Sequence, residues 1–267
     1  MNYRTILVEK KPGYALVTLH RPGEMNAISR EMRSELENGF TSLEEDPEVR
    51  AIILTGGNYL FSAGMDLKEM ASIPDSEIRD YFSSMSRYLK KIYGCKKPVI
   101  AVVGGIALGG GFNLATVCDM IIASESAIFG HPELKFGLNP LFDPLRQIVG
   151  RSKAKELTML GEPIGAQEAF RIGLVNKIAP PEKLMTEAES IAQELARRSP
   201  EAIQAVKRMS ETTPQLDKQS AIDLEINMEA SLFSRAERKQ HMGEFLEELK
   251  SRKKTKVDIS FDRPKID

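Results

Sequence analysis

The chain has 267 residues, of which 42% are hydrophobic and 28% are charged. This length and composition are typical of an ordinary globular protein with a substantial core. Lysine and arginine number 37 and aspartate and glutamate 38, which gives a net charge of -1. Such a balance favours neither a nucleic acid nor a membrane surface as a partner.

The cysteines and histidines indicate whether the protein contains disulfides or a metal site. Cys95 and Cys118 match no metal-binding or redox spacing, so we interpret them as reduced core thiols of a cytoplasmic protein. His20, His131 and His241 stand apart from one another and no H-E-x-x-H pattern occurs, so no metal site is expected. The sequence also lacks a signal-peptide pattern and any run of about 18 apolar residues, so no membrane span is expected.

The N-terminal half predicts an alternation of strands and helices, which is typical of an α/β core. Apolar runs and alternating patterns predict strands at Thr5–Val8, Tyr14–Leu19, Ala51–Thr55, Val99–Val103 and Met120–Ala123. The turn at Pro12-Gly13 joins the first two strands into a hairpin. Apolar residues at helical spacing predict helices after Ser29, at Met65–Met70, at about Glu77–Tyr93, and from the glycine-rich turn to about Val117.

The C-terminal half becomes helical. Helical periodicity is present in six segments, separated by glycine and proline: Ser152–Leu160, Ala166–Ile172, Glu182–Arg197, Glu201–Met209, Gln219–Phe233 and Ala236–Ser251. The last residues, Thr255–Asp267, are polar and predict an extended tail. A basic cluster near Lys250 is best interpreted as a solvated helix end.

Two glycine-containing segments are the most informative feature: F-S-A-G-M-D-L at Phe61–Leu67 and A-L-G-G-G-F-N-L-A at Ala107–Ala115. Each puts glycine where the backbone can approach a ligand and opens a predicted helix. N–H groups in the first turn of a helix lack intrahelical partners, so two that converge form an oxyanion hole. The glycines alone also fit a tight turn with close packing, but they match neither a dinucleotide loop nor a phosphate-binding loop.

These segments resemble the two signatures of the crotonase (enoyl-CoA hydratase/isomerase) superfamily, and the resemblance extends from about Leu16 to about Phe245. It implies an α/β fold of ββα turns stacked as a spiral, followed by a C-terminal helical region that serves trimerisation. We therefore expect a spiral core with an acyl-CoA site at residues 1–200, a helical trimerisation region at 201–254 and the tail at 255–267. Self-association as a trimer or a dimer of trimers is implied.

The resemblance also implies which groups act on the acyl-CoA. In the family, two backbone N–H groups polarise the thioester carbonyl, and here they would belong to Met65 and Gly110. Typical hydratases carry two catalytic glutamates. The second is present as Glu133 in the segment F-G-H-P-E, whereas Asn113 replaces the first. Glu133 is therefore the predicted general acid/base, while the Asn113 amide can only hold a water or orient the substrate.

Family positions that contact coenzyme A carry over to the first signature, the loop before it and the C-terminal region. The residues that would cradle the adenine or line the CoA groove are Asn26, Ser62, Ala63, Asp66, Leu67 and Lys68. Phe245 matches an aromatic residue that covers the CoA of a neighbouring subunit. The expected phosphate-binding lysine is Glu248 here, and Lys250 is a possible substitute.

Two further polar residues leave their roles open. His131 precedes Glu133 by two residues, so either a hydrogen bond in the site or a purely structural role fits. Asp143 lies near the position of an extra catalytic aspartate in some superfamily members, but its register is displaced. Because Pro144 follows, we predict that Asp143 is the N-cap of a helix.

The sequence predicts an enzyme that stabilises a thioester enolate in enoyl-CoA hydration or double-bond isomerisation, with Glu133 as the single acid/base. Single-glutamate members of the superfamily include isomerases, and a one-glutamate hydratase is chemically possible. The alternatives are another crotonase-type reaction, such as cyclic dienoyl-CoA hydration or decarboxylation, and a non-catalytic acyl-CoA-binding protein. No metal or redox cofactor is expected, since coenzyme A is part of the substrate.

Overall fold

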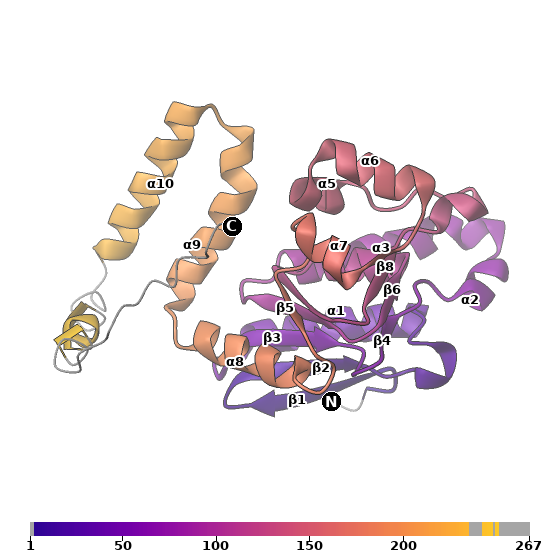
Figure 1. The fold of residues 1–267 in the computed structure, drawn as a ribbon, viewed down its shortest axis with the longest axis horizontal. Helices are drawn as coiled ribbons and strands as arrows, with labels where there is room; N and C mark the ends of the chain where they lie inside the picture. Colours follow the sequence, from indigo (N-terminus) through magenta and orange to yellow (C-terminus); the bar gives the residue numbers. More distant parts are fainter. Residues whose placement is uncertain (1–2, 235–241, 248, 251–267) are drawn as a thin grey trace, which may run out of the picture. The chain divides into compact units, whose positions relative to one another are not determined.

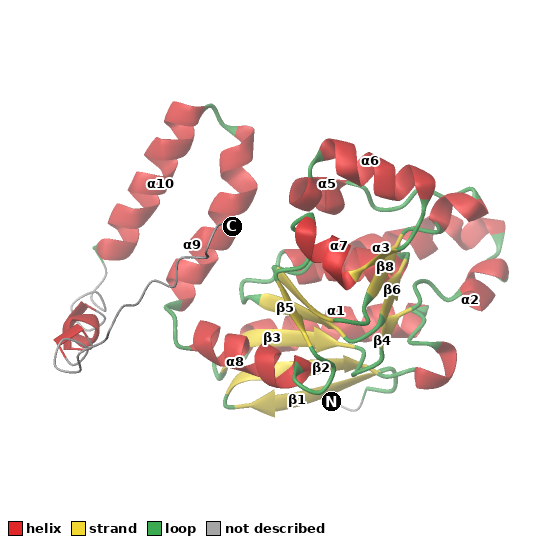
Figure 2. Cartoon of the chain, viewed as in Figure 1, coloured by secondary structure: helices red, strands yellow, loops and turns green. Residues whose placement is uncertain are grey.

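The computed structural model describes residues 3–234, 242–247 and 249–250, and the chain divides into two compact units, Met1–Ile203 and Gln204–Asp267. The first unit is a mixed α/β structure, which Figures 1 and 2 show as strands surrounded by helices. The described part of the second unit is helical. The α/β fold class expected from the sequence is therefore confirmed.

A six-stranded sheet forms the base of the first unit, in the order β1-β2-β3-β5-β7-β10. The strands are β1 (Ile6–Lys11), β2 (Gly13–Leu19), β3 (Val49–Thr55), β5 (Val99–Val103), β7 (Met120–Ser124) and β10 (Lys177–Ala179). β1 and β2 pair antiparallel as the predicted hairpin, and every other pair in this sheet is parallel. All five strands predicted in the N-terminal half are confirmed.

The central strands β3 and β5 are buried on both faces, which explains the continuous apolar sequence of β3. Ile52 and Leu54 pack on one face with α1 (Arg30–Glu45) and α3 (Ile78–Tyr93). Ala51 and Ile53 pack on the other face, where α8 (Leu184–Ala196) contributes Leu184, Ala188 and Ala192. Each fully buried isoleucine or leucine stabilises this core by about 1.5–3 kcal/mol.

A second, smaller sheet has the order β4-β6-β8-β9. Its strands are β4 (Leu60–Ser62), β6 (Ile106–Leu108), β8 (Ile128–Gly130) and β9 (Ile164–Gly165). β4, β6 and β8 run parallel to one another, whereas β9 is antiparallel to β8. The sequence did not predict these strands, because two or three residues are too few to establish a periodicity.

The remaining helices of the first unit are short. They are η1 (Pro22–Glu24), α2 (Leu67–Ala71), η2 (Asp75–Glu77), α4 (Gly110–Thr116), η3 (Glu133–Phe136), α5 (Asp143–Val149), α6 (Arg151–Leu160) and α7 (Ala166–Arg171). The helix predicted at Met65–Met70 begins two residues later, so Met65 itself lies in the preceding loop. As predicted, Ser29 caps α1 by accepting a hydrogen bond from the N–H of Met32.

The C-terminal helices begin with α9 (Pro200–Thr212), continue through η4 (Thr213–Gln215) and include α10 (Lys218–Phe233). Asp217 caps α10, in which no residue is buried. The helix predicted at Ala236–Ser251 falls partly outside the described residues, although 242–247 and 249–250 are helical. The predicted tail lies outside them entirely. None of the helices that the structure describes is long and apolar enough to span a membrane.

Candidate active site

The candidate site lies where three neighbouring parallel strands end. Met65 follows β4, Gly110 follows β6, and Glu133 follows β8, in each case within three residues of the strand. β6 pairs with β4 on one side and with β8 on the other. Because parallel strands present their carboxyl ends at one edge of a sheet, segments far apart in the sequence converge here.

The two glycine-containing segments pack backbone against backbone. A Cβ atom on Gly64 would lie 2.8 Å from the carbonyl oxygen of Leu108, and one on Gly111 would lie 2.4 Å from that of Ser62. Gly64 also has a φ of 106°, which side chains rarely adopt. Glycine is therefore required at these positions for the two segments to approach so closely.

This packing brings the nitrogen atoms of Met65 and Gly110 together. A Cβ atom on Gly110 would lie 3.3 Å from the Met65 nitrogen, and one on Gly64 would lie 3.2 Å from the Gly110 nitrogen. Gly110 is the first residue of α4, so its N–H has no intrahelical acceptor. Two amides close to each other, one at a helix N-terminus, are the arrangement that an oxyanion hole needs.

Ile28 fixes the orientation of the peptide that carries the Met65 N–H. These two residues form an isolated parallel bridge. The N–H of Ile28 donates to the carbonyl of Gly64 at 2.8 Å, and its carbonyl accepts from the N–H of Asp66 at 3.4 Å. Because Ile28 bonds only to the residues on either side of Met65, the N–H of Met65 points away from Ile28.

The carboxylate of Glu133 lies beside the glycine turn. A Cβ atom on Gly109 would lie 3.4 Å from the Glu133 Oε1 atom, and Gly109 directly precedes Gly110. Nδ1 of His131 lies 3.4 Å from the same oxygen in hydrogen-bonding geometry and 3.3 Å from Oε2. The His131 ring in turn stacks on Phe112, with the ring centroids 4.5 Å apart.

Three buried polar atoms at this place have no hydrogen-bond partner among the described residues: Oδ1 of Asn113, Nε2 of His131 and Oε2 of Glu133. Asn113 lies on the first turn of α4, where its N–H donates to the carbonyl of Gly109. Buried polar atoms are normally satisfied, since an unmade hydrogen bond costs about 1–3 kcal/mol. Unsatisfied acceptors on Asn113 and Glu133 therefore point to a binding or catalytic use.

The predicted CoA-contacting residues of the first signature surround the start of α2. Leu67 and Lys68 are exposed, whereas Ala63 and Asp66 are half-buried. Asp66 caps α2 and pairs with Arg21, whose NH1 lies 2.9 Å from the Asp66 carboxylate. Burial raises the pKa of Asp66, but the hydrogen bonds from Arg21 and from the Glu69 N–H outweigh it, so the net shift is downward and the carboxylate is ionised.

The side chain of Asn26 makes hydrogen bonds within the chain. Its side chain is 2% exposed, and its amide nitrogen donates to the carbonyls of Gly56 and Phe61. Its Oδ1 atom accepts from the N–H of Arg21. The amide therefore holds three backbone segments together, and the contact of Asn26 with the CoA stays a prediction.

Among the C-terminal positions, Phe245 is 54% exposed and Lys250 pairs with Glu247 at 2.6 Å. Glu248 lies outside the described residues. The prediction for Asp143 is wrong by one residue, because α5 begins at Asp143 and the N-cap position is occupied by Phe142. The carboxylate of Asp143 instead accepts from the side chains of Arg146 and Gln147 one turn further along.

Sequence reasoning missed Arg33 and Glu69, which form an ion pair close to the Met65 segment. Arg33 follows Met32 on the apolar side of α1, and a charged residue at the edge of an apolar stripe is ordinarily exposed. Here its side chain is 1% exposed. The only feature of the sequence that indicated a buried Arg33 was its position next to the apolar stripe of α1, and this position alone does not predict burial.

Comparison with known proteins identifies the family of this chain. A family model described as enoyl-CoA hydratase/isomerase matches residues 9–256. A probable mitochondrial enoyl-CoA hydratase of Dictyostelium discoideum is 38% identical, over 91% of this chain and 88% of its own. A crotonyl-CoA hydratase of Syntrophomonas wolfei is 36% identical, over 94% of this chain and 98% of its own.

The solved structures agree as well. The crystal structure of an enoyl-CoA hydratase from Bacillus anthracis superposes with a TM-score of 0.87 at 32% identity, covering 92% of this chain and 97% of that one. The crotonase fold that the resemblance implied is thus confirmed. The chain belongs to the enoyl-CoA hydratase/isomerase family of enzymes and has the crotonase fold.

Proposed function

We propose that this enzyme adds water across the double bond of a 2-enoyl-CoA thioester. The observation that carries the proposal is the close approach of the Met65 and Gly110 backbone segments beside the carboxylate of Glu133. A relative that is 36% identical over nearly the whole chain is named crotonyl-CoA hydratase, which supports a short-chain enoyl thioester as the substrate.

The two amides would receive the thioester carbonyl oxygen. When a nucleophile adds to C3 of the conjugated system, negative charge moves to that oxygen and an enolate forms. An N–H held in place before the reaction stabilises this charge without reorganisation, and one such donor contributes about 2.7–4 kcal/mol. Both donors belong to the main chain, so the side chain of Met65 affects shape rather than chemistry.

Glu133 and Asn113 would hold the water. The Glu133 carboxylate and the Asn113 amide each present a buried oxygen without a hydrogen-bond partner among the described residues. A water that donates one proton to each oxygen keeps a lone pair free to attack C3. Glu133 then takes a proton from the water and returns it to C2 of the enolate, so a single carboxyl group serves as base and acid.

The coenzyme and the assembly complete the proposal. Main-chain groups around Ser62, Ala63, Asp66 and Leu67, with the exposed Lys68, would hold the CoA, and Phe245 would cover the CoA of a neighbouring subunit. We also propose self-association through the C-terminal helices as a trimer or a dimer of trimers. The chemistry uses Glu133, water and two amides, with no metal or redox cofactor.

Isomerisation is the second candidate, and the presence of asparagine at position 113 favours it. Asn113 cannot exchange protons, and an isomerase needs only one base that moves a proton between C2 and C4. The same oxyanion hole serves that reaction, because it also passes through an enolate. The two reactions differ in whether a water must be held.

A panel of 2-enoyl-, 3-enoyl- and cyclic dienoyl-CoA thioesters tests the proposal. We expect turnover of crotonyl-CoA to 3-hydroxybutyryl-CoA, which is measured by chromatography of the product. Asn113→Ala should lower hydration more than any isomerisation, because only hydration needs a held water. If only 3-enoyl thioesters are turned over, the enzyme is an isomerase and not a hydratase. If no thioester of the panel is turned over, the proposal is overturned.

A further inference from the structure

We infer that Arg33 is a positioning residue for the oxyanion hole: through Ile28 and Glu69 it fixes the segment that carries the Met65 amide. This inference rests on the proposed function. Arg33 is the largest fully buried side chain in the part of the chain that the structure describes, and the mechanism above makes no use of it. A buried charge is costly unless it is paired and hydrogen-bonded, so its presence calls for a reason.

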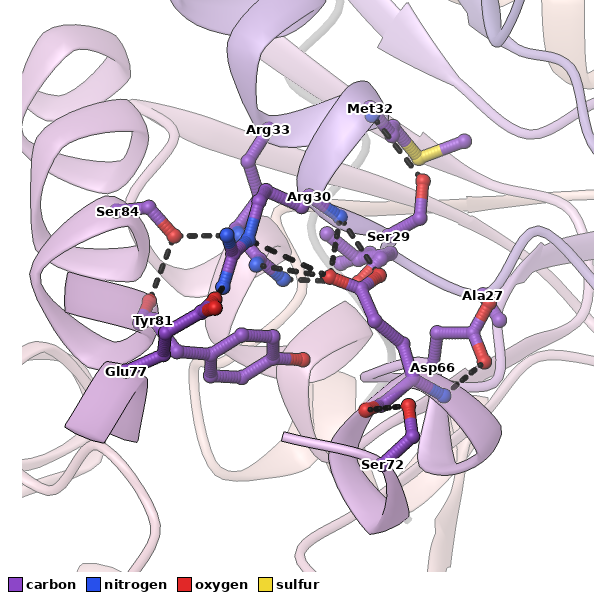
Figure 3. A network of polar contacts seen from close by, with 12 residues as sticks. Ala27, Ser29, Arg30, Met32, Arg33, Asp66, Ser72, Glu77, Tyr81 and Ser84 are labelled. Carbon is purple, nitrogen blue, oxygen red and sulfur yellow. Dashed lines mark hydrogen bonds and ion pairs between the residues drawn. The ribbon is translucent and has the colours of Figure 1, made fainter. Parts of the chain in front are cut away.

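The guanidinium of Arg33 contacts three elements (Figure 3). Nε donates to Oγ of Ser84 on α3 at 2.9 Å, and NH1 donates to the carbonyl of Ile28 at 3.2 Å. NH2 lies 3.5 Å from Oε1 of Glu69 on α2. The guanidinium carbon also lies 4.2 Å from the centre of the Tyr81 ring, a cation–π contact.

Two of these contacts lead directly to Met65. The carbonyl of Ile28 accepts from Arg33 and also from the N–H of Asp66, the residue after Met65. Ile28 is the residue whose bridge turns the Met65 N–H away from itself. A displacement of Ile28 would therefore rotate the Met65 peptide and move its N–H away from the Gly110 N–H.

The contact with Glu69 fixes α2, which starts two residues after Met65. None of the residues of α2 is fully buried, so apolar packing does little to hold this helix in place. Glu69 instead accepts hydrogen bonds from the N–H of Arg30 at the start of α1, at 2.8 and 3.1 Å. An acidic side chain at a helix N-terminus is favourable, and here it links α2 to α1.

The charge of Arg33 is balanced by Glu69. Burial raises the pKa of Tyr81 and outweighs the opposing effect of Arg33, so this neighbouring hydroxyl stays protonated. Burial likewise raises the pKa of Tyr88. Both phenols are therefore neutral, and the attraction of Arg33 is directed to the carboxylate that holds α2.

Lysine cannot replace arginine at this position. The planar guanidinium serves Ser84, Ile28 and Glu69 at once from different nitrogen atoms, whereas an ammonium is a single point charge on a flexible stem. Arg33→Lys keeps the charge and Arg33→Met keeps the approximate length of the side chain. Both variants lose the planar guanidinium with its several N–H donors. The two variants together separate the charge from the geometry.

A matched control uses Arg87 on α3. Its Nε lies 3.6 Å from Glu37 on α1, so it joins the same two helices, but its side chain is 59% exposed and the pair does not involve α2. Arg87→Met should leave catalysis unchanged. Glu69→Gln is a second test, since it keeps one acceptor oxygen for the Arg30 N–H and removes the charge that faces Arg33 and Arg30.

The experiment measures carbonyl polarisation as well as rate. Butyryl-CoA labelled with ¹³C at the thioester carbonyl cannot be hydrated, and hydrogen bonds from two amides lower the stretching frequency of its C=O group in a difference infrared spectrum. We expect a lowered frequency in the unmodified enzyme and with Arg87→Met. With Arg33→Met and Arg33→Lys the shift should shrink, and kcat on crotonyl-CoA should fall by up to about 100-fold with KM little changed.

The outcomes are distinguishable. Folded Arg33 variants that keep both the full frequency shift and kcat would overturn the inference and leave the proposed function intact. Absence of any shift in the unmodified enzyme would overturn the oxyanion assignment and the inference with it. If both Arg33 variants fail to fold, Glu69→Gln decides: a smaller shift supports the inference, and an unchanged shift overturns it.

Discussion

The carboxylate of Glu133 lies beside Gly109 and within 3.4 Å of Nδ1 of His131. Its side chain is only 15% exposed, so its freedom to turn away from the glycine segment is small. Glu133→Gln has nearly the same shape but cannot accept a proton. We expect kcat to fall by about 10²–10⁴-fold while the affinity for butyryl-CoA, measured by calorimetry, stays within a fewfold of its original value.

An almost unchanged rate for Glu133→Gln on the best substrate would contradict the assignment of the acid/base. His131 or Asp143 would then have to take the role. The structure makes Asp143 the weaker of these two, because its carboxylate already binds Arg146 and Gln147 and their hydrogen bonds lower its pKa.

His131 is placed to orient Glu133. It is buried, it stacks on Phe112, and its Nδ1 reaches the Glu133 carboxylate. His131→Phe preserves a stacked ring and removes that contact. A lost hydrogen bond of about 1–1.5 kcal/mol corresponds to roughly a tenfold lower kcat, with KM little changed.

The conservative variant His131→Asn distinguishes positioning from packing. Asparagine returns a polar atom close to the place of Nδ1 but loses the ring. If His131 orients Glu133, His131→Asn should retain more kcat than His131→Phe, although His131→Phe should have the higher melting temperature. The reverse order of kcat values would show that the ring matters only for packing.

Part of the site could be predicted from the sequence because it consists of backbone groups. Gly110 and Met65 were assigned through the resemblance of the two glycine-containing segments to the crotonase superfamily, and the structure packs these two segments against each other. The contacts of Arg33 and Glu69 were not predictable, because they join residues far apart in the chain through side-chain geometry that no local pattern records. The hydrogen bonds of the Asn26 side chain were not predictable for the same reason.

The length of each helix or strand decided whether it could be predicted from the sequence. Long helices such as α1 and the buried strands of the large sheet have enough residues to display a period. β4, β6 and β8 have three residues each, yet these strands bring Met65, Gly110 and Glu133 to one edge. The elements most important for the site were thus the least visible in the sequence.

The pair between Arg21 and Asp66 allows a test of how α2 is held. The folded-state pKa of Asp66 lies below its ordinary value near about 4, because hydrogen bonds from Arg21 and the Glu69 N–H outweigh burial. A lowered carboxylate pKa adds stability above the ordinary pKa, and that stability is lost as the pH falls through the folded-state value. Asp66→Asn keeps a good helix cap and removes only the charge.

We expect Asp66→Asn to lower the stability at neutral pH by about 1 kcal/mol, with the difference shrinking in acid as the Asp66 carboxylate becomes protonated. Thermal unfolding at several pH values measures this. In an Arg21→Met background the effect of Asp66→Asn should largely disappear, since its partner is gone. A stability difference that does not depend on pH would show that the ion pair contributes nothing.

At the scale of the whole molecule, the notable feature is the exposed apolar side chains of the C-terminal helices. On α10, the side chains of Ile222, Ile226 and Phe233 are each more than half exposed. Periodicity predicted that α10 is a helix, but no pattern within one chain specifies the partner of an exposed apolar side chain. For this reason the sequence indicated an oligomer only through its resemblance to a family.

We expect the intact protein to sediment as a trimer or a dimer of trimers, because apolar side chains on α10 gain about 1.5–3 kcal/mol each when an interface buries them fully. Replacing Ile222 and Ile226 together by glutamate places two charges there and should shift the protein towards monomers. Gln219→Glu adds a charge on the first turn of the same helix, where it suits the helix dipole, and should leave the assembly unchanged. Sedimentation velocity at several concentrations distinguishes these species, and a monomeric intact protein would contradict the role assigned to the C-terminal helices.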